Sequence, residues 1–137
     1  MNKIFIDTEV AGLNPSKHDI LSLAIVVVDD DKVIDFVQFN RSGDLRIDVA
    51  LLRNMPLERL HNSLINPLPE EEFKQSVTNV LTKYKNEDTY IFGYNISFDI
   101  SFLKILFKDN YYKLFPTRVI DVKSILEYLI IRLYFIK

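Results

Sequence analysis

Apolar stretches of strand length fill the first forty residues. Residues 4–6 form a short apolar run, and residues 19–28 are rich in β-branched side chains, which predicts a buried strand. The side chains of residues 32–40 alternate between the two faces of an extended strand. This pattern predicts a hairpin partner with at least one face on a core. Three aspartates at 29–31 mark the turn between the two strands. We therefore expect three consecutive strands.

Helical spacing of apolar residues dominates the rest of the chain. Between residues 46 and 68 the spacing is irregular and Pro56 interrupts it, so we expect two short helices there. Pro69 and the three glutamates after it are typical of a helix start, because acids in the first turn complement the helix dipole. Further elements are expected as a strand at 91–93, a helix from about Asn95, a strand at 117–120 and, capped by Asp121, a last helix from Val122 to about Ile136.

The order of these elements favours one mixed domain. Strands come first, and helices then alternate with single strands, which indicates an α/β protein with a mixed sheet and helices against its faces. With 137 residues and 48% hydrophobic content, the chain can build one sizeable core and is too short for two. We expect a single domain over residues 1–137.

Composition excludes several kinds of protein. The chain has no Cys, which rules out a disulfide framework, a thiol nucleophile and a thiolate zinc site. It shows no basic-then-apolar signal segment and no apolar run of membrane length, so we expect a cytoplasmic protein without a membrane partner. The formal net charge of −2 argues against a general nucleic-acid coat, which relies on a basic surface.

The net charge hides an asymmetry along the chain. Residues 1–100 carry 10 Lys and Arg against 16 Asp and Glu, a net charge of −6, whereas residues 101–137 carry 7 against 3, a net charge of +4. The basic residues are either solvated helix faces or a guide for an acidic strand. They include Lys104, Lys108, Lys113, Arg118, Lys123 and Arg132.

Two carboxylates interrupt the first strand. Asp7 and Glu9 are two residues apart, so in an extended strand both point to the same side, opposite Ile4 and Ile6. Adjacent acids repel each other unless a cation lies between them, and hard cations such as Mg²⁺ are held by carboxylates, water and phosphates. A solvated strand end is the plain alternative.

A second motif gives this pair a context. The chain reads Phe-Ile-Asp-Thr-Glu-x-x-Gly-Leu over residues 5–13 and Gly-Tyr-Asn-x-x-Phe-Asp-x-x-Phe-Leu over residues 93–103. Together these segments resemble the first two motifs of the DEDD-type 3′-to-5′ exonucleases, a family that includes the proofreading epsilon subunit of bacterial DNA polymerase III. The resemblance implies a ribonuclease H-like fold. In that fold a mixed five-stranded sheet, flanked by helices, has three antiparallel strands followed by two that join parallel to the first.

The resemblance also implies a two-metal site that hydrolyses nucleotides from a 3′ end. Asp7 would bridge two Mg²⁺ or Mn²⁺ ions, Glu9 would bind the ion that activates water, and Asp99 would hold the second ion. Two such ions neutralise charge on the phosphate and hold the attacking and leaving oxygens in line. Asp99 has its own plain alternative, an exposed first-turn acid favoured by the helix dipole.

Five neighbouring residues match substrate positions of the family. Thr8, Gly12 and Leu13 match residues that meet the 3′-terminal nucleotide. Asn95 and Phe98 match a polar contact and an apolar wall. The alternative to substrate contact is core packing for Leu13 and Phe98, and for Gly12 it is a simple role in a turn. The implied partner is a single-stranded 3′ end of DNA or RNA, and a DNA polymerase subunit is a further candidate.

The third motif of the family is absent from the sequence. The histidine subclass places His five residues before a final Asp, but residues 127–137 contain neither. We interpret His18 as a loop residue and His61 as a helix-surface residue. We expect an exonuclease domain truncated at its C-terminus, with impaired catalysis and an exposed apolar run on its last helix. The alternative is a non-catalytic module that binds a nucleic-acid end or a polymerase.

Overall fold

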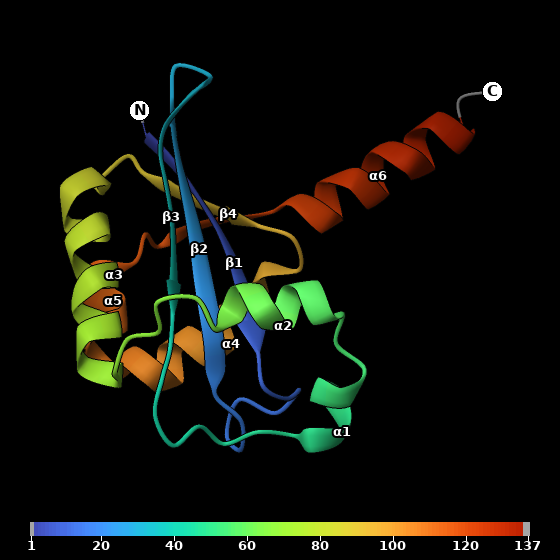
Figure 1. The fold of residues 1–137 in the computed structure, drawn as a ribbon. Coiled ribbons are helices and arrows are strands. Elements are labelled where there is room, and N and C mark those ends of the chain that lie inside the picture. The colour runs from blue at the N-terminus through green and yellow to red at the C-terminus, as the bar shows by residue number, and fades with distance from the viewer. Residues whose placement is uncertain (1, 136–137) are drawn as a thin grey trace.

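The computed structural model of the protein describes residues 2–135 and contains a five-stranded sheet (Figure 1). The strands are β1 Asn2–Val10, β2 Ile20–Asp29, β3 Lys32–Asn40, β4 Tyr90–Gly93 and β5 Arg118–Asp121. Their order in the sheet is β3-β2-β1-β4-β5. The first three strands pair antiparallel, whereas β4 lies parallel to β1 and β5 parallel to β4. The expected strand directions are therefore confirmed.

The helices follow the expected order along the chain. Pro56 separates the first two helices, as its missing N–H predicts. The short turn η1 (Lys108–Asn110) and the helix after it were not predicted, because so few residues cannot show a helical period. The expected end of the last helix at Ile136 lies outside the described residues. The helices are α1 Val49–Arg53, α2 Leu57–Ser63, α3 Glu70–Tyr84, α4 Ile96–Phe107, α5 Tyr111–Leu114 and α6 Val122–Phe135.

The β2–β3 hairpin has the expected turn but a more exposed second strand. Both residues at 30–31 have positive φ, which suits the right-handed twist of a two-residue turn. In β3, Val37 and Phe39 pack against the core, whereas Val33 and Phe36 are 65% and 62% exposed. The prediction of a core-facing strand is thus correct for its second half only.

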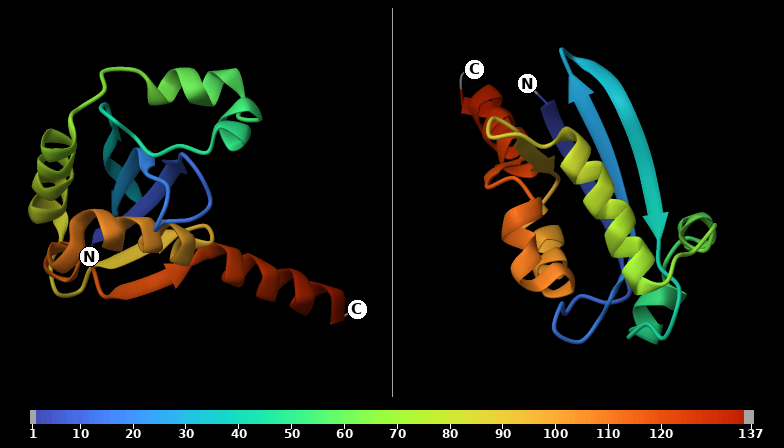
Figure 2. Two further views of the ribbon diagram at one scale, coloured as in Figure 1. Left: turned by 90° about the horizontal axis from the view of Figure 1, so that it is seen from below. Right: turned by 90° about the vertical axis from the view of Figure 1, so that its left-hand side faces the viewer.

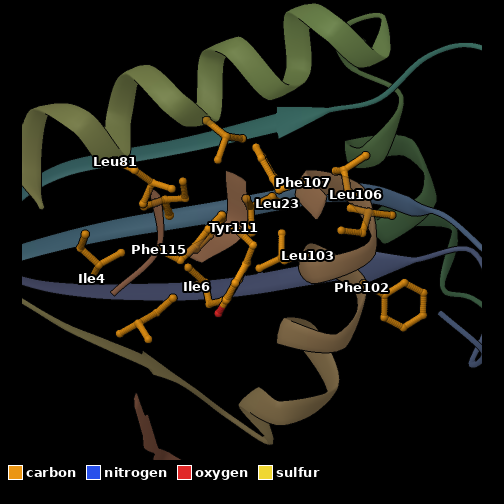
Figure 3. Close-up of a cluster of buried hydrophobic side chains, with 14 of the residues drawn as sticks. Ile4, Ile6, Leu23, Leu81, Phe102, Leu103, Leu106, Phe107, Tyr111 and Phe115 are labelled. Atoms are coloured by element: carbon orange, nitrogen blue, oxygen red, sulfur yellow. The ribbon is translucent and has the colours of Figure 1, made fainter. Parts of the chain in front are cut away.

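The core lies between one face of the sheet and helices α3 and α4. Figure 3 shows Ile4 and Ile6 of β1 in one cluster with Leu81 of α3 and Leu103 of α4. Each of these side chains is at most 4% exposed. Burial of one such side chain stabilises the fold by about 1.5 to 3 kcal/mol. Alternate residues of β1 anchor this face, which leaves the other residues of the strand free for chemistry on the opposite side.

Helix α6 extends away from the rest of the molecule (Figures 1 and 2). Its apolar side chains have few neighbours, so Ile130 is 65% exposed and Leu133 is 69% exposed. The expected exposure of the last helix is confirmed as far as Tyr134, and the side chains beyond it lie outside the description. Among residues 2–135, no helix combines the length and apolar character needed to cross a membrane.

Candidate functional site

The carboxyl end of β1 carries the two acids of the first motif. The strand alternates between buried Ile6 and Thr8 on one side and the more exposed Asp7 and Glu9 on the other. Asp7 is exposed and Glu9 is half-buried, which agrees with the side predicted from their spacing. The two acids therefore lie on the face of the sheet opposite the core.

Asp99 reaches the same end of β1 from the first turn of α4. Its side chain is buried, and the Thr8 hydroxyl donates a hydrogen bond to its Oδ1. Thr8 stands between Asp7 and Glu9 in the strand but its side chain points to the other face, so this bond brings Asp99 to the same end of β1 from the core side. The alternative of an exposed first-turn acid is therefore wrong for Asp99, which is 5% exposed.

The three carboxylates influence one another electrostatically, and we call Asp7, Glu9 and Asp99 the carboxylate site. Burial and, to a smaller extent, the charges of Asp7 and Glu9 raise the pKa of Asp99 to about 6, against the opposing effect of the hydrogen bond from Thr8. Burial also raises the pKa of Glu9, an effect that Arg59 opposes and Asp7 reinforces. Negative charge at this strand end is thus incompletely balanced by the protein itself.

The donor set of the carboxylate site fits a hard divalent cation. All three side chains are carboxylates, and Mg²⁺ and Mn²⁺ prefer oxygen donors of this kind. However, no group of three or more His, Cys, Asp or Glu side chains within residues 2–135 is arranged as a metal centre. The expected coordination by all three residues therefore stays a prediction.

Arg59 was not predicted as part of this site. It lies on α2, and its Nε is 3.8 Å from Oε1 of Glu9. Arg59 also lines a small cavity of about 100 Å³ together with Asp7, Glu9 and residues of β2, β3 and α2. Irregular apolar spacing in this part of the sequence gave no signal for such a contact. The arginine supplies the positive charge that partly balances Glu9.

Gly12 and Leu13 lie in the loop that follows the carboxyl end of β1. A Cβ atom at position 12 would lie 2.1 Å from the His18 ring, so the glycine is required by this close approach. The Leu13 side chain is 67% exposed, which makes the alternative of core packing wrong for this residue. An exposed apolar side chain at this place is available to a ligand.

Asn95 and Phe98 lie at the start of α4. Asn95 adopts a left-handed conformation with φ of 54°, and its backbone N–H donates to Oδ1 of Asp121 at 2.9 Å. Asp121 also accepts from the N–H of Lys123, which confirms it as the cap of α6. Phe98 is half-buried against the core and contacts Phe102 edge to face, so core packing and substrate contact both remain open for it.

The histidines and the basic C-terminal residues lie outside the carboxylate site. His18 is in the loop after β1, where its Nδ1 accepts from the Asn14 N–H, and His61 is exposed on α2. Both interpretations are confirmed. Of the basic residues singled out above, Lys123 is half-buried and the others are exposed. They are distributed over α4, η1, α5, β5 and α6, which favours solvated surfaces over one strand-guiding face.

Comparisons with known proteins point in one direction. The sequence model of the RNase_T family, described as an exonuclease, matches residues 4–135. An oligoribonuclease of Tropheryma whipplei (strain Twist) is 28% identical over 130 residues, and the match covers 90% of this chain and 70% of that protein.

Solved structures share the fold. The zinc-bound form of E. coli exonuclease I in complex with single-stranded DNA superposes with a TM-score of 0.70 and 21% identity over 91% of this chain. Exonuclease I from Methylocaldum szegediense gives a TM-score of 0.67 and 19% identity, also over 91% of this chain. The chain spans 28% of the length of each of these two proteins.

Proposed function

The chain belongs to the DEDD-type exonuclease family and has its ribonuclease H-like fold, and from this premise we propose that it hydrolyses nucleotides from the 3′ end of a single strand. The observation that carries the proposal is the electrostatic coupling of Asp7, Glu9 and Asp99 near the carboxyl end of β1, which helps to raise the pKa values of Glu9 and Asp99. Acids that the protein leaves incompletely balanced are suited to hold cations.

Asp7, Glu9 and Asp99 would hold two divalent ions, Mg²⁺ or Mn²⁺. Such ions, when bound, supply the charge that stabilises the pentacoordinate phosphate and lower the pKa of a bound water. Arg59 keeps Glu9 paired in their absence, at 3.8 Å. Thr8 fixes the position of Asp99 through its hydroxyl, so α4 and β1 are joined at the site.

The neighbouring apolar side chains support a single-stranded substrate. Leu13 is 67% exposed in the loop that follows β1, and Phe98 lies at the start of the helix that carries Asp99. A terminal base can be wedged by such side chains only when it is unpaired. We expect a single-stranded 3′ end to bind more tightly than a blunt duplex at equal salt, and Leu13→Ala to reduce that preference.

Three finer points belong to the same proposal. Residues 1–137 contain no His-x-x-x-x-Asp motif, so these residues by themselves lack a fourth carboxylate and a general base, whose assistance is commonly worth 10² to 10⁴ in rate. We therefore propose slow turnover by this chain alone. A polymerase partner rests on the sequence resemblance alone, and cytoplasmic location on the composition. Both stay predictions.

A direct test measures the release of nucleotides from a 3′-labelled single strand in Mn²⁺. The wild-type chain should show weak release that falls at least about 100-fold in Asp7→Ala, the scale of losing one preorganised electrostatic group. Asp88→Ala, which removes an exposed acid before β4, is the matched control and should act like wild type. Release that is equal in all three proteins would contradict the proposal. Strand binding without any release would favour the non-catalytic alternative.

A further inference from the structure

A second cavity lies apart from the carboxylate site. Its volume is about 310 Å³, at the lower end of the range for small-molecule sites. It is enclosed by the loop after β1, the segment after β3, the start of α3 and the second half of α4. None of the carboxylate-site residues lines it. We call it the Arg41 cavity, after the buried residue in its wall.

Arg41 is unusual among the lining residues because its charge is almost fully buried. Its side chain is 6% exposed, and its Nη2 donates to Oε1 of Glu70 at 3.0 Å. The Arg41 Nε, also buried, has no hydrogen-bond partner within residues 2–135. A guanidinium has five N–H donors and no acceptor, and a buried donor without a partner costs about 1 to 3 kcal/mol. The cavity wall therefore contains a guanidinium whose hydrogen-bonding capacity the protein leaves partly unmet.

The charge of the lining favours an anion. Arg41, Arg46, Lys74 and Lys108 face Asp19, Asp44 and Glu70, an excess of one positive charge with His18 neutral. Two of the acids are already paired, because Arg46 lies 2.7 Å from Asp19 and Arg41 lies 3.0 Å from Glu70.

The two lysines of the lining, Lys74 and Lys108, have weaker or no ion pairs with acids. Lys74 contacts Glu70 at 4.0 Å and Glu71 at 3.7 Å. Within residues 2–135, no acid lies at ion-pair distance from Lys108, the exposed residue at the end of α4. A cation would meet net repulsion in such a cavity, and an anion would meet a free lysine and an unsatisfied arginine.

We propose that the Arg41 cavity binds a phosphate group. Arginine matches the oxygens of phosphate with parallel N–H donors, and lysine adds a point charge. Phe102, Ile105 and Leu106 of α4 also line the cavity, and they add an apolar surface suited to a sugar or base attached to the phosphate. The group is a phosphodiester of a nucleic-acid strand or the monoester of a free nucleotide.

Helix α4 connects this cavity with the carboxylate site. Asp99 and Ile105 are six residues apart on it, which corresponds to roughly 9 Å along the axis. A strand that occupied both regions would therefore contact them with phosphates only a few nucleotides apart. The phosphate site itself does not depend on the proposed exonuclease activity, since it requires neither metal nor hydrolysis.

The experiment is a titration of the whole chain, in EDTA, followed by amide chemical shifts. The probes are inorganic phosphate, thymidine 5′-monophosphate, a thymidine tetranucleotide without terminal phosphate, and the same tetranucleotide with an uncharged methylphosphonate backbone. Saturable shifts at Arg41, Lys74 and Lys108 with the charged probes are expected. Tighter binding of the charged tetranucleotide assigns the site to a strand, and tighter binding of the mononucleotide assigns it to a free nucleotide.

Two variants locate the site without disturbing Arg41. Ile105→Trp fills the cavity from a position that is 42% exposed, and should weaken phosphate binding at least about tenfold, or 1.4 kcal/mol. Its matched control is Ile125→Trp at a 46% exposed position on α6, which should bind like wild type. Lys108→Asn tolerates the φ of 52° at this position and should weaken binding by a smaller factor.

Three outcomes would overturn the proposal. The first is no saturable binding of any charged probe. The second is equal binding by wild type and Ile105→Trp. The third is equal binding of the charged and uncharged tetranucleotides, which would show that phosphate is not recognised. Because all titrations are free of metal, failure here is distinct from failure of the nuclease assay.

Discussion

The carboxylate site and the Arg41 cavity lie in one small domain but have opposite electrostatic character. At the carboxylate site, burial and neighbouring acids raise the pKa values of Glu9 and Asp99. At the Arg41 cavity, the pKa of Asp19 is lowered, because hydrogen bonds and charge from Arg46 outweigh its burial. The pKa values of acids are thus raised in the first region, and the pKa of Asp19 is lowered in the second.

A chain with a net charge of only −2 thus contains an acid-rich region and a base-rich region. Overall charge is nearly balanced, but the balance is not local. The carboxylate site has three acids with one nearby arginine, and the Arg41 cavity has four basic side chains with three acids. Each region is therefore suited to a ligand that supplies the missing charge, a metal cation in one and an oxyanion in the other.

The largest change in stability is expected from Asp99→Asn in metal-free protein. The pKa of Asp99 is about 6 in the folded protein and 3.8 in the unfolded chain. The protonated side chain therefore stabilises the fold fully below pH 3.8, and this contribution is lost as the pH rises through about 6. Wild type should therefore lose up to about 3 kcal/mol relative to Asp99→Asn between pH 4 and pH 7. Urea unfolding in EDTA across this range measures the difference, with Asp109→Asn as the control. A stability difference that does not change with pH would show that Asp99 is not strained.

Thr8→Val should have the next largest effect. The substitution keeps the shape of the side chain but removes the hydroxyl that donates to Asp99. A buried carboxylate that loses its donor costs about 1 to 3 kcal/mol at neutral pH. Thermal or urea unfolding should show this loss, and Thr8→Ser, which keeps the hydroxyl, should recover most of it. Equal stability of the Val and Ser variants would mean that the bond contributes nothing.

Arg59→Ala changes the only cation paired with the carboxylate site in residues 2–135. Since Arg59 is 65% exposed and 3.8 Å from Glu9, its ion pair is worth less than about 1 kcal/mol. Its removal should free Glu9 and strengthen Mn²⁺ binding by about two- to fivefold in titration calorimetry. Arg53→Ala on α1 is the control. Weaker Mn²⁺ binding in Arg59→Ala would show that the arginine supports the metal site instead of competing with it.

Asp19→Asn should have the smallest effect, with the opposite dependence on pH. A lowered pKa means that the stability from Asp19 and Arg46 is present above pH 3.8 and is lost as pH falls below that value. The pair is partly exposed, so solvent and salt screen it. Unfolding at pH 7 and at pH 3 should show a small loss at neutral pH that is smaller at pH 3. A loss that grows on acidification would contradict this account.

Local patterns in the sequence predicted which side of the first strand carries Asp7 and Glu9. The two-residue spacing of Asp7 and Glu9 set their common side, because a strand has a side-chain period of two. Apolar runs and Pro56 predicted the three strands and the two short helices, and the resemblance carried by the paired motifs implied the strand directions of the sheet. These features depend on neighbours in sequence, so a local pattern can encode them.

Contacts between side chains that are far apart in the sequence become visible only in the tertiary structure. Thr8 and Asp99 are 91 residues apart, and Arg41 and Glu70 are 29 apart, yet each pair forms a hydrogen bond. The contact of Arg59 with Glu9 and the half-exposed β3 likewise depend on where helices pack. No periodicity specifies such contacts, because they follow from the packing of whole elements on the sheet, and that packing buries Arg41 and leaves the carboxylates short of partners.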